Sequence, residues 1–258
     1  ILISPRTNDD IIKLINFSKK ENIEIIFIGS GSNVLASDTG FKGIVITLKK
    51  ALNKIIFYDN EIYTQAGAML GTIVKKAINK GYKGFESLVG VPGTVGGALI
   101  MNAGAHGSEI SELFVSARTI NNNGEINSYV KNDIFFSYRK SSFNNKEILL
   151  DAKFKIIKGL KDNIIKRKNN VSLKRKESQP LKYRSAGSIF KNPGSNLAAG
   201  YLIDKAGLKG LRIGDAEISK KHANFIINHG NASANEIFTL IKIMENKVKE
   251  KFKIILEL

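Results

Sequence analysis

The sequence contains no cysteine and no tryptophan, and only four of its residues are proline. Without cysteine the chain can form no disulfide, supply no thiolate nucleophile and offer no sulfur ligand to a metal ion. Its apolar stretches are short, and none approaches the roughly 20 residues that a transmembrane helix needs. The chain opens on residues 1–10 (ILISPRTNDD), which lack the basic start and apolar stretch of a signal peptide. These absences favour a cytoplasmic protein that does not insert into a membrane.

Acidic residues are also scarce, since 23 Asp and Glu face 40 Lys and Arg, which gives a net charge of +17. Attraction to nucleic acid is the usual use of such an excess. The one dense basic run, residues 166–176 (KRKNNVSLKRK), lacks the interleaved aromatic residues of a single-strand binding platform. The other basic residues are spread widely, as in Lys-, Asn- and Ile-rich proteins of AT-rich genomes. The same charge suits a small ligand with several phosphates, so we expect no nucleic-acid partner.

The pattern of apolar residues predicts a mixture of helices and strands over 258 residues, enough for one large domain or two ordinary ones. Thr7 followed by Asn8, Asp9 and Asp10 predicts a helix start, because a capping residue precedes acids in the first turn. The other predicted helices cover residues 69–80, 160–177, 196–206 and 233–252. The predicted strands cover residues 23–28, 43–48, 147–157 and 223–228, with hairpins at 54–66 and 113–129 and a last strand starting at Ile254. The fold class is therefore α+β, with two lobes joined near residues 157–180.

Two glycine-rich segments stand out in the first lobe. Residues 29–33 (GSGSN) follow a predicted strand, where successive backbone N–H groups can form a nest for an anion. A plain turn that ends a strand is the other interpretation. Residues 90–107 (GVPGTVGGALIMNAGAHG) are rich in glycine yet apolar, unlike a flexible linker. They are typical either of a backbone that lies against a ligand or of a buried packing motif.

Polar side chains that could carry chemistry follow in two later motifs. Tyr138 and Arg139 lie in the stretch SYRKSSF, and an arginine offers a fixed fork for a carboxylate or a developing oxyanion. Ser188 lies in SAGSIFKNP, and its hydroxyl can pass on a proton if neighbours tune it. Each residue alone is more often a surface arginine or a turn serine. The three histidines have no metal-ligand spacing, so we expect no metal site.

Taken together, these motifs resemble the UDP-N-acetylenolpyruvoylglucosamine reductase (MurB) family over essentially the whole chain and in the right order. The matching stretches are GSGSNVL (29–35), GVPGTVGGALIMNAGAHGSEI (90–110), YRKSSF (138–143), QP (179–180), SAGSIFKNP (185–193), AGYLIDKAG (199–207) and ISKKHANFIIN (218–228). The short spacing between Ser188 and His222 resembles the compact, type II-like form of that family, which lacks a tyrosine-bearing insertion.

The resemblance implies a fold and a reaction. It implies an FAD-binding domain of the vanillyl-alcohol-oxidase type at residues 1–158 and a smaller α+β substrate-binding domain at residues 159–258. It implies noncovalent FAD, NADPH as the hydride donor, and reduction of UDP-N-acetylglucosamine-enolpyruvate to UDP-N-acetylmuramate for peptidoglycan synthesis. This reaction needs stabilisation of oxyanion charge on the substrate and delivery of a proton to its α-carbon.

The resemblance also implies roles for named residues. Arg139 and Ser188 are the expected catalytic pair, as oxyanion stabiliser and proton donor. Tyr138, Lys191, Asn192 and Asn224 are the expected substrate-binding residues. The residues expected to bind FAD come from the two glycine segments: Gly29, Ser30, Gly31, Ser32, Asn33, Val34, Leu35, Gly90, Pro92, Gly93, Thr94, Val95, Gly96, Gly97, Ala98, Asn102, Ala103 and Gly104.

The chain departs from the family pattern at both ends. The family usually begins with a segment that contains a VGG-like turn, and this chain opens after that point. The family also has a C-terminal catalytic glutamate, which would be the next residue after Leu258, so we interpret Glu257 as its neighbour and the sequence as clipped at both ends. Three alternatives stay open: a polyanion binder that reuses the fold, a degenerate relative without activity, and a flavin oxidoreductase with another substrate.

Overall fold

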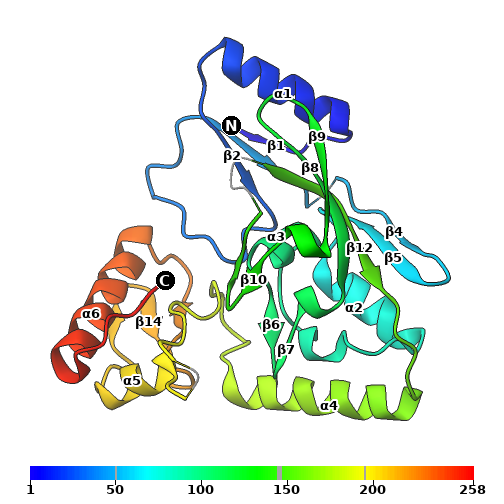
Figure 1. Ribbon diagram of the computed structural model, residues 1–258. Coiled ribbons are helices and arrows are strands. Elements are labelled where there is room, and N and C mark those ends of the chain that lie inside the picture. The colour runs from blue at the N-terminus through cyan, green and yellow to red at the C-terminus, as the bar shows by residue number, and fades with distance from the viewer. Residues whose placement is uncertain (50, 144–146, 195) are drawn as a thin grey trace. The chain divides into compact units, whose positions relative to one another are not determined.

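The computed structural model describes residues 1–49, 51–143, 147–194 and 196–258 (Figure 1). The chain forms two compact units. Residues 1–31 and 42–173 make the first, and residues 32–41 and 174–258 make the second. Each unit has its own core of buried apolar side chains, as expected when an α+β chain of this length divides.

A three-stranded parallel sheet opens the first unit, with strands β1 (Leu2–Ile3), β2 (Ile25–Ile28) and β3 (Ile44–Thr47) in the order β1-β3-β2. Helix α1 (Asn8–Lys20) joins β1 to β2 and buries Ile11 and Ile15. Its start confirms the predicted capping, because the Thr7 hydroxyl accepts the Asp10 N–H and the Asp10 carboxylate accepts the Thr7 N–H.

A five-stranded antiparallel sheet forms the rest of the frame, in the order β4-β5-β12-β8-β9. Its strands are β4 (Ile55–Phe57), β5 (Glu61–Gln65), β8 (Phe114–Ile120), β9 (Ile126–Val130) and β12 (Ile148–Lys155). The two predicted hairpins are confirmed, since β4 pairs with β5 and β8 with β9. The first unit also contains helices α2 (Leu70–Asn79) and α3 (Val95–Ile100), which Figure 1 labels beside this sheet.

The first unit also contains several short elements outside its two larger sheets. They are the two-residue strands β6 (Gly104–Ala105), β7 (Ser108–Glu109), β10 (Phe136–Ser137) and β11 (Lys140–Ser141), and the 3₁₀ helices η1 (Glu86–Leu88), η2 (Ile110–Glu112) and η3 (Lys131–Asp133). Strands β6 and β7 form one antiparallel pair, and β10 and β11 form another. None of these short elements follows from periodicity, because two or three residues show no period.

The second unit packs helices on a small sheet. Helix α4 (Lys161–Ser178) leads into it from the first unit, and the sheet order is β13 (Arg212–Ile213), β14 (Ala216–Ile218), β15 (Ile226–Asn228). Helices α5 (Ala199–Lys205) and α6 (Ala234–Phe252) cover its core. The predicted capping box of α6 is confirmed, since Ser233 and Glu236 each accept the other's backbone N–H.

Three predictions of elements need correction. No strand begins at Ile254, because residues 253–258 pair with none of the described strands; the Lys191 N–H donates a single hydrogen bond to the Glu257 carbonyl at 2.7 Å. Helix α5 starts at Ala199 instead of residue 196. Strand β15 starts at Ile226, because the chain turns just before it, where the Phe225 N–H donates to the His222 carbonyl at 3.0 Å. Among the described helices, none is both long and apolar enough to cross a bilayer.

Candidate active site

The three parallel strands of the first unit end at a hollow of about 230 Å³. It is lined by residues in and after β1 (Leu2 and Ser4), at the end of β2 (Ile28, Gly29 and Ser30) and at the end of β3 (Thr47 and Lys49). Ligands of parallel sheets bind at the carboxyl ends of the strands. This hollow combines a glycine turn with the exposed ammonium-bearing side chain of Lys49, and such a combination suits an anionic ligand.

The first glycine turn contacts the second glycine segment. A side chain at Gly29 would bring a Cβ atom to 2.6 Å from the Thr94 hydroxyl oxygen, so only glycine fits there. The Gly29 carbonyl accepts the Thr47 hydroxyl at 2.7 Å, and Gly31 has a φ of +73°, in the left-handed region. Thr94 in turn caps α3, since its hydroxyl accepts the Gly97 N–H at 3.3 Å. The structure therefore brings the two predicted segments together within one unit.

The second glycine segment has one packed face and one exposed face. The N–H groups of Val95 and Gly96 donate to the carbonyls of Ala68 and Ala66 at 2.8 and 2.9 Å, and Val95 and Gly96 are buried. Gly97 is exposed, and a Cβ atom there would meet no neighbour closer than the Thr94 hydroxyl at 3.6 Å. The packing interpretation therefore describes one face of α3, while the other leaves room for a ligand against the backbone.

Asn102 is the buried polar centre of this segment. Its side-chain amide group donates to the Glu109 carboxylate at 2.6 Å and to the Ser137 carbonyl at 3.0 Å. Its Oδ1 atom is buried without a hydrogen-bond partner among the described residues. An acceptor left in this state costs roughly 1–3 kcal/mol unless a ligand or water supplies a donor. The orphaned oxygen therefore fits a bound group that presents an N–H, as a flavin ring does.

Arg139 lies at the turn between β10 and β11. Its φ of +57° is rare for a residue with a side chain, and its guanidinium carbon lies 5.5 Å from the centre of the Tyr138 ring. Two hydrogen bonds anchor this hairpin to the glycine segment. One is the Asn102 bond to the Ser137 carbonyl, and the other runs from the Ser141 hydroxyl to the Ile100 carbonyl at 2.8 Å. The predicted oxyanion stabiliser and the second glycine segment therefore form one connected assembly.

The remaining predicted residues lie in the second unit. Ser188 is exposed on the irregular segment 185–193, which also carries Lys191 and Asn192. Lys191 forms an ion pair with Glu257, and the Asn192 carbonyl oxygen Oδ1 accepts the Ala199 N–H at the start of α5 at 3.1 Å. Asn224 is only 3% exposed, and its side chain forms two hydrogen bonds with the backbone of Phe190.

The predicted FAD-binding stretch 29–35 is shared between the units. Gly29, Ser30 and Gly31 belong to the first unit, together with every predicted residue of the second glycine segment. Residues 32–35 belong to the second unit, where the apolar side chains of Val34 and Leu35 are 50% and 44% exposed. Single exposed apolar side chains are common at protein surfaces, so the contact of these two with FAD stays a prediction.

His222 and His229 have partners within the second unit. The His222 Nδ1 atom accepts the Asn224 N–H at 3.3 Å, and burial lowers the pKa of this imidazole, so the neutral form predominates at pH 7. The His229 Nε2 atom lies 2.7 Å from the Glu217 carboxylate. No three metal-ligating side chains gather at one point in the part of the chain that the structure describes.

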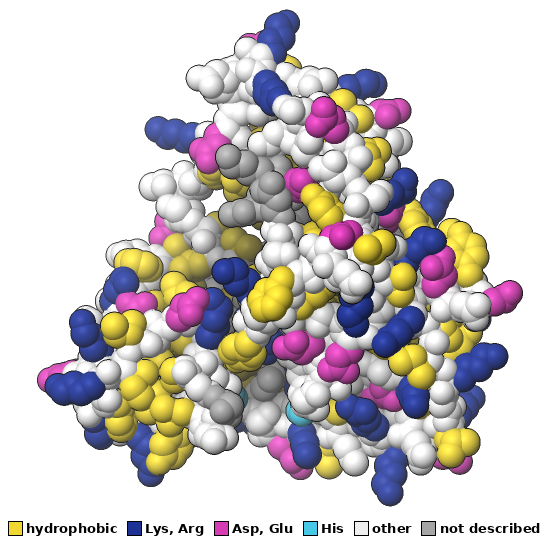
Figure 2. Space-filling view, in the orientation of Figure 1, with side chains coloured by type: hydrophobic (Ala, Val, Ile, Leu, Met, Phe, Trp, Pro, Cys, Tyr) yellow, Lys and Arg dark blue, Asp and Glu magenta, His cyan; other side chains and the backbone are white. Residues whose placement is uncertain are grey.

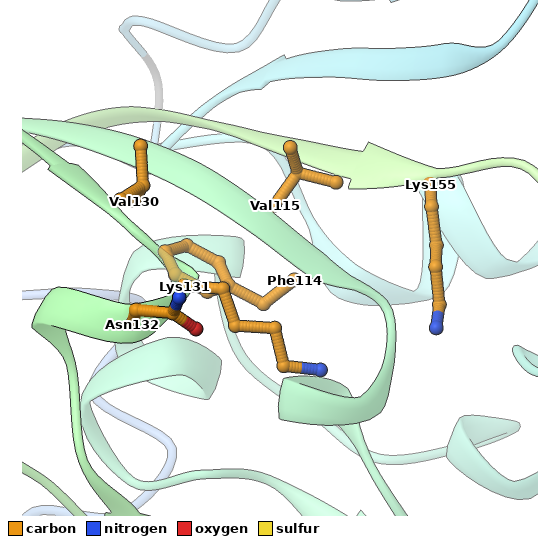
Figure 3. Close-up of a pocket in the computed structure, with 6 residues that line it drawn as sticks. All are labelled: Phe114, Val115, Val130, Lys131, Asn132 and Lys155. Carbon is orange, nitrogen blue, oxygen red and sulfur yellow. The ribbon is translucent and has the colours of Figure 1, made fainter.

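A larger hollow of about 370 Å³ lies elsewhere in the first unit (Figure 3). It is lined by Phe114, Val115, Val130, Lys131, Asn132 and Lys155. These side chains come from β8, β9, η3 and β12 (Figure 3), and none of them is a predicted site residue. An apolar surface with two exposed lysines and no partner among the described residues that would tune them gives no basis for chemistry there, so we place the site at the glycine segments.

Lys49 and Ser4 are not among the residues predicted from sequence. A lysine two residues after a short β-branched run carries no signal of its own in a chain with 40 basic residues. What would identify it is the strand order β1-β3-β2, which brings the ends of β2 and β3 side by side. That order is a property of the folded sheet.

Comparisons with known families match both halves of the chain. Residues 1–128 match the FAD binding domain family. Residues 179–258 match the C-terminal domain family of UDP-N-acetylenolpyruvoylglucosamine reductase. The two matches fall on the two halves of the chain in which the flavin-contact and proton-donor residues are predicted.

Whole-length relatives are similar to the chain as well. The UDP-N-acetylenolpyruvoylglucosamine reductase of Clostridium kluyveri is 44% identical over 255 residues, which cover 98% of this chain and 83% of the relative. The corresponding enzyme of Caldicellulosiruptor bescii is 43% identical over 259 residues, covering 99% and 82%. The crystal structure of UDP-N-acetylenolpyruvylglucosamine reductase from Thermus caldophilus superposes with a TM-score of 0.83 at 32% identity, covering 99% of this chain and 90% of that one.

Proposed function

The chain belongs to the UDP-N-acetylenolpyruvoylglucosamine reductase family, and from this premise we propose how its own residues divide the work of the reaction. It is an FAD-dependent oxidoreductase that reduces UDP-N-acetylglucosamine-enolpyruvate to UDP-N-acetylmuramate with NADPH. The product is a precursor of peptidoglycan. One hydride adds to the terminal carbon of the enolpyruvyl group and one proton to its α-carbon, while NADPH becomes NADP⁺.

The FAD-binding residues are those around the two glycine segments. FAD, when bound, accepts the hydride of NADPH and passes it to the substrate. Lys49 and the turn at Gly29–Gly31 would hold the anionic diphosphate at the hollow, and the exposed backbone at Gly97 would lie against a flat ring. The orphaned Oδ1 atom of Asn102 would accept an N–H of that ring. These features support noncovalent binding, because each is a backbone, hydrogen-bonding or ionic contact.

Arg139 is the proposed stabiliser of the substrate's developing charge. Addition of hydride to the terminal carbon leaves negative charge on the α-carbon, which spreads into the adjoining carboxylate. A guanidinium in a fixed position lowers the energy of this charge without reorganising. The left-handed backbone at Arg139 costs roughly 1 kcal/mol. The observation that carries the proposal is that hydrogen bonds from Asn102 and Ser141 hold this strained turn to the glycine segment.

Ser188 is the proposed proton donor to the α-carbon. It lies exposed on the segment that carries Lys191 and Asn192, and these two residues with Tyr138 are the proposed substrate contacts. A serine hydroxyl is a weak acid, so its placement against the acceptor carbon must account for much of its effect.

Substitution of Ser188 by alanine tests its proposed role as the proton donor. In anaerobic absorption measurements, NADPH should bleach the flavin of Ser188→Ala at the wild-type rate, because that step does not need the hydroxyl. Recolouring by the enolpyruvyl substrate should slow by about 10²–10⁴-fold, the usual contribution of a general acid. Ser185→Ala, on the same exposed segment, is the control and should behave as wild type. Turnover that survives in Ser188→Ala contradicts the role.

We further propose that the reaction takes place in the bacterial cytoplasm and serves cell-wall synthesis, and with it cell shape and division. A UDP-sugar substrate and NADPH as reductant support this placement. Neither ligand is a nucleic acid, and the net charge of +17 suits their phosphates.

A further inference from the structure

We propose that Asn224 is a positioning residue that fixes the backbone on which Ser188 is presented, and that it acts through Phe190 instead of contacting substrate. The inference rests on the proposed role of Ser188 as proton donor. It departs from the substrate contact that the resemblance implies for Asn224.

The segment around Ser188 has no regular structure, so its backbone groups need partners from elsewhere. Three of these backbone groups have their partner on Asn224. The Ile189 N–H, directly after Ser188, donates to the Asn224 backbone carbonyl at 2.9 Å. The Phe190 N–H donates to the Asn224 Oδ1 atom at 3.0 Å, and the Asn224 Nδ2 group donates back to the Phe190 carbonyl at 2.8 Å. Three hydrogen bonds to one residue therefore fix the chain within two positions of Ser188.

Asn224 is itself held firmly. It is 3% exposed, as is the Phe190 side chain, which packs in the core of the second unit. Its N–H donates to the His222 Nδ1 atom, and its Cβ atom lies 3.5 Å from where a Cβ at Gly200 would stand. We call the three hydrogen bonds that join Asn224 to Ile189 and Phe190 the clamp. The clamp connects the Ser188 segment to the start of α5 and to the turn before β15, both of which belong to the second unit.

The side-chain chemistry of asparagine matches this task. An amide offers one acceptor and one donor group in a single plane, so it can bond the N–H and the C=O of the same residue. An ionised aspartate keeps the acceptor but loses the donor, and it would repel the Phe190 carbonyl. Alanine keeps neither bond. A buried amide whose donor and acceptor both engage Phe190 is more suited to holding the backbone than to recognising a substrate.

Loss of the clamp should alter the chemistry more than the binding. Displacement of a reacting group by about 1 Å can lower a rate about 100-fold. Substrate affinity should change less, because Lys191 and Asn192 have separate anchors, through the Lys191 N–H to the Glu257 carbonyl and through the Asn192 Oδ1 atom to the Ala199 N–H. A direct substrate contact would show the opposite pattern, with weaker binding and an unchanged limiting rate.

The experiment measures both half-reactions of the FAD-loaded protein in anaerobic stopped flow for wild type, Asn224→Ala and Asn224→Asp at pH 8. We expect flavin reduction by NADPH within twofold of wild type in both variants. The limiting rate of reoxidation by substrate should fall at least 30-fold in both variants, with the half-saturating substrate concentration within threefold. The solvent deuterium isotope effect on reoxidation should increase, because proton delivery becomes slower.

Ile241→Val is the matched control, since Ile241 is a buried residue of the same core on α6, and its apolar side chain takes no part in the hydrogen bonds between Asn224 and the Ser188 segment. It should lower stability and leave both half-reactions unchanged. Amide hydrogen exchange in wild type gives a test that needs no variant: the Ile189 and Phe190 N–H groups should exchange slowly although they lie outside helices and strands. Rapid exchange at both overturns the clamp.

Each contrary outcome has a distinct meaning. A rise in the half-saturating substrate concentration with an unchanged limiting rate overturns positioning in favour of direct contact. Equal losses in both half-reactions overturn it in favour of a general effect on folding. Turnover by Ser188→Ala removes the proposed function of Ser188 and this inference with it. An inactive Ser188→Ala beside a fully active Asn224→Ala overturns this inference alone.

Discussion

Lys49 places a positive charge at the carboxyl ends of β2 and β3, next to the turn at Gly29 and Ser30. If this hollow holds the diphosphate of FAD, Lys49→Glu replaces an attraction with a repulsion. We expect the dissociation constant for FAD to rise roughly 10- to 100-fold, since a charge-assisted contact contributes about 1.5–3 kcal/mol. Quenching of flavin fluorescence during titration of the flavin-free protein measures it.

The matched control for this variant is Lys75→Glu, which makes the same change of charge on the exposed face of α2. It should leave FAD affinity within about twofold, because Lys75 does not line the hollow and an exposed charge is screened by salt. Equal affinity losses in the two variants would mean that net charge, and not the hollow, governs FAD binding.

Individual residues differ in how far the sequence alone predicts their position. Gly29 and Thr94 are predicted as FAD contacts from motifs 65 positions apart along the printed sequence, and the structure brings them into contact. Asn224 is predicted from its motif, yet its burial and its bonds to Phe190 come only from the fold. Motif similarity identifies which residues matter. The partners of each side chain depend on tertiary packing.

At the scale of elements, the start of α6 depends on a residue from far along the chain. The Asp38 carboxylate accepts the N–H groups of Ala234 and Asn235 at 2.7 and 3.1 Å. Asp38→Ala removes this acceptor from the positive end of the helix. We expect the free energy of unfolding of the second unit to fall by about 1–2 kcal/mol. Thermal denaturation followed by circular dichroism, with chemical denaturation for the free energy, measures the loss.

Asp59→Ala is the control for this substitution, because Asp59 lies exposed in the turn between β4 and β5. It should change stability by less than about 0.5 kcal/mol. An Asp38→Ala protein as stable as wild type would show that Ser233 alone caps α6 adequately.

Long elements with local signals are the ones that the sequence predicts well. Helices α1 and α6 carry capping boxes and regular apolar spacing, and the structure confirms both starts. The hairpins at β4–β5 and β8–β9 are marked by turn residues. The strand predicted at Ile254 is wrong because an apolar run becomes a strand only where a neighbouring strand pairs with it. Strands β13 and β14 are too short to show any alternation.

At the scale of the whole molecule, the predicted α+β class is confirmed. Composition does not predict which residues belong to which unit. The composition changes near residue 159, just before α4 begins. The boundary between the two units instead falls inside α4, because its residues up to 173 pack with the first unit and its residues from 174 pack with the second. Residues 32–41 also leave the first unit and pack with the second. The assignment of residues 1–158 to FAD and 159–258 to the substrate stays a prediction.

The net charge of +17 is a property of the whole molecule and predicts a dependence on salt. Figure 2 shows Lys and Arg side chains scattered over the face that it draws, with no single basic cluster. Such a field raises the rate at which anions with several phosphates arrive, by roughly 10- to 1000-fold in strongly steered cases. Because the Debye length falls from about 30 Å at 0.01 M salt to about 10 Å at 0.1 M, added salt removes this attraction.

We therefore expect kcat/KM for NADPH and for the UDP-linked substrate to fall several-fold between 0.01 M and 0.3 M potassium chloride, with kcat nearly constant. Steering acts on encounter, whereas the chemical step occurs after the ligands are bound. Sucrose at matched osmolality is the control, since it changes water activity without screening charge. A kcat/KM that stays flat with salt, or that falls equally in sucrose, would mean that the basic surface does not recruit these ligands and that its charge serves solubility alone.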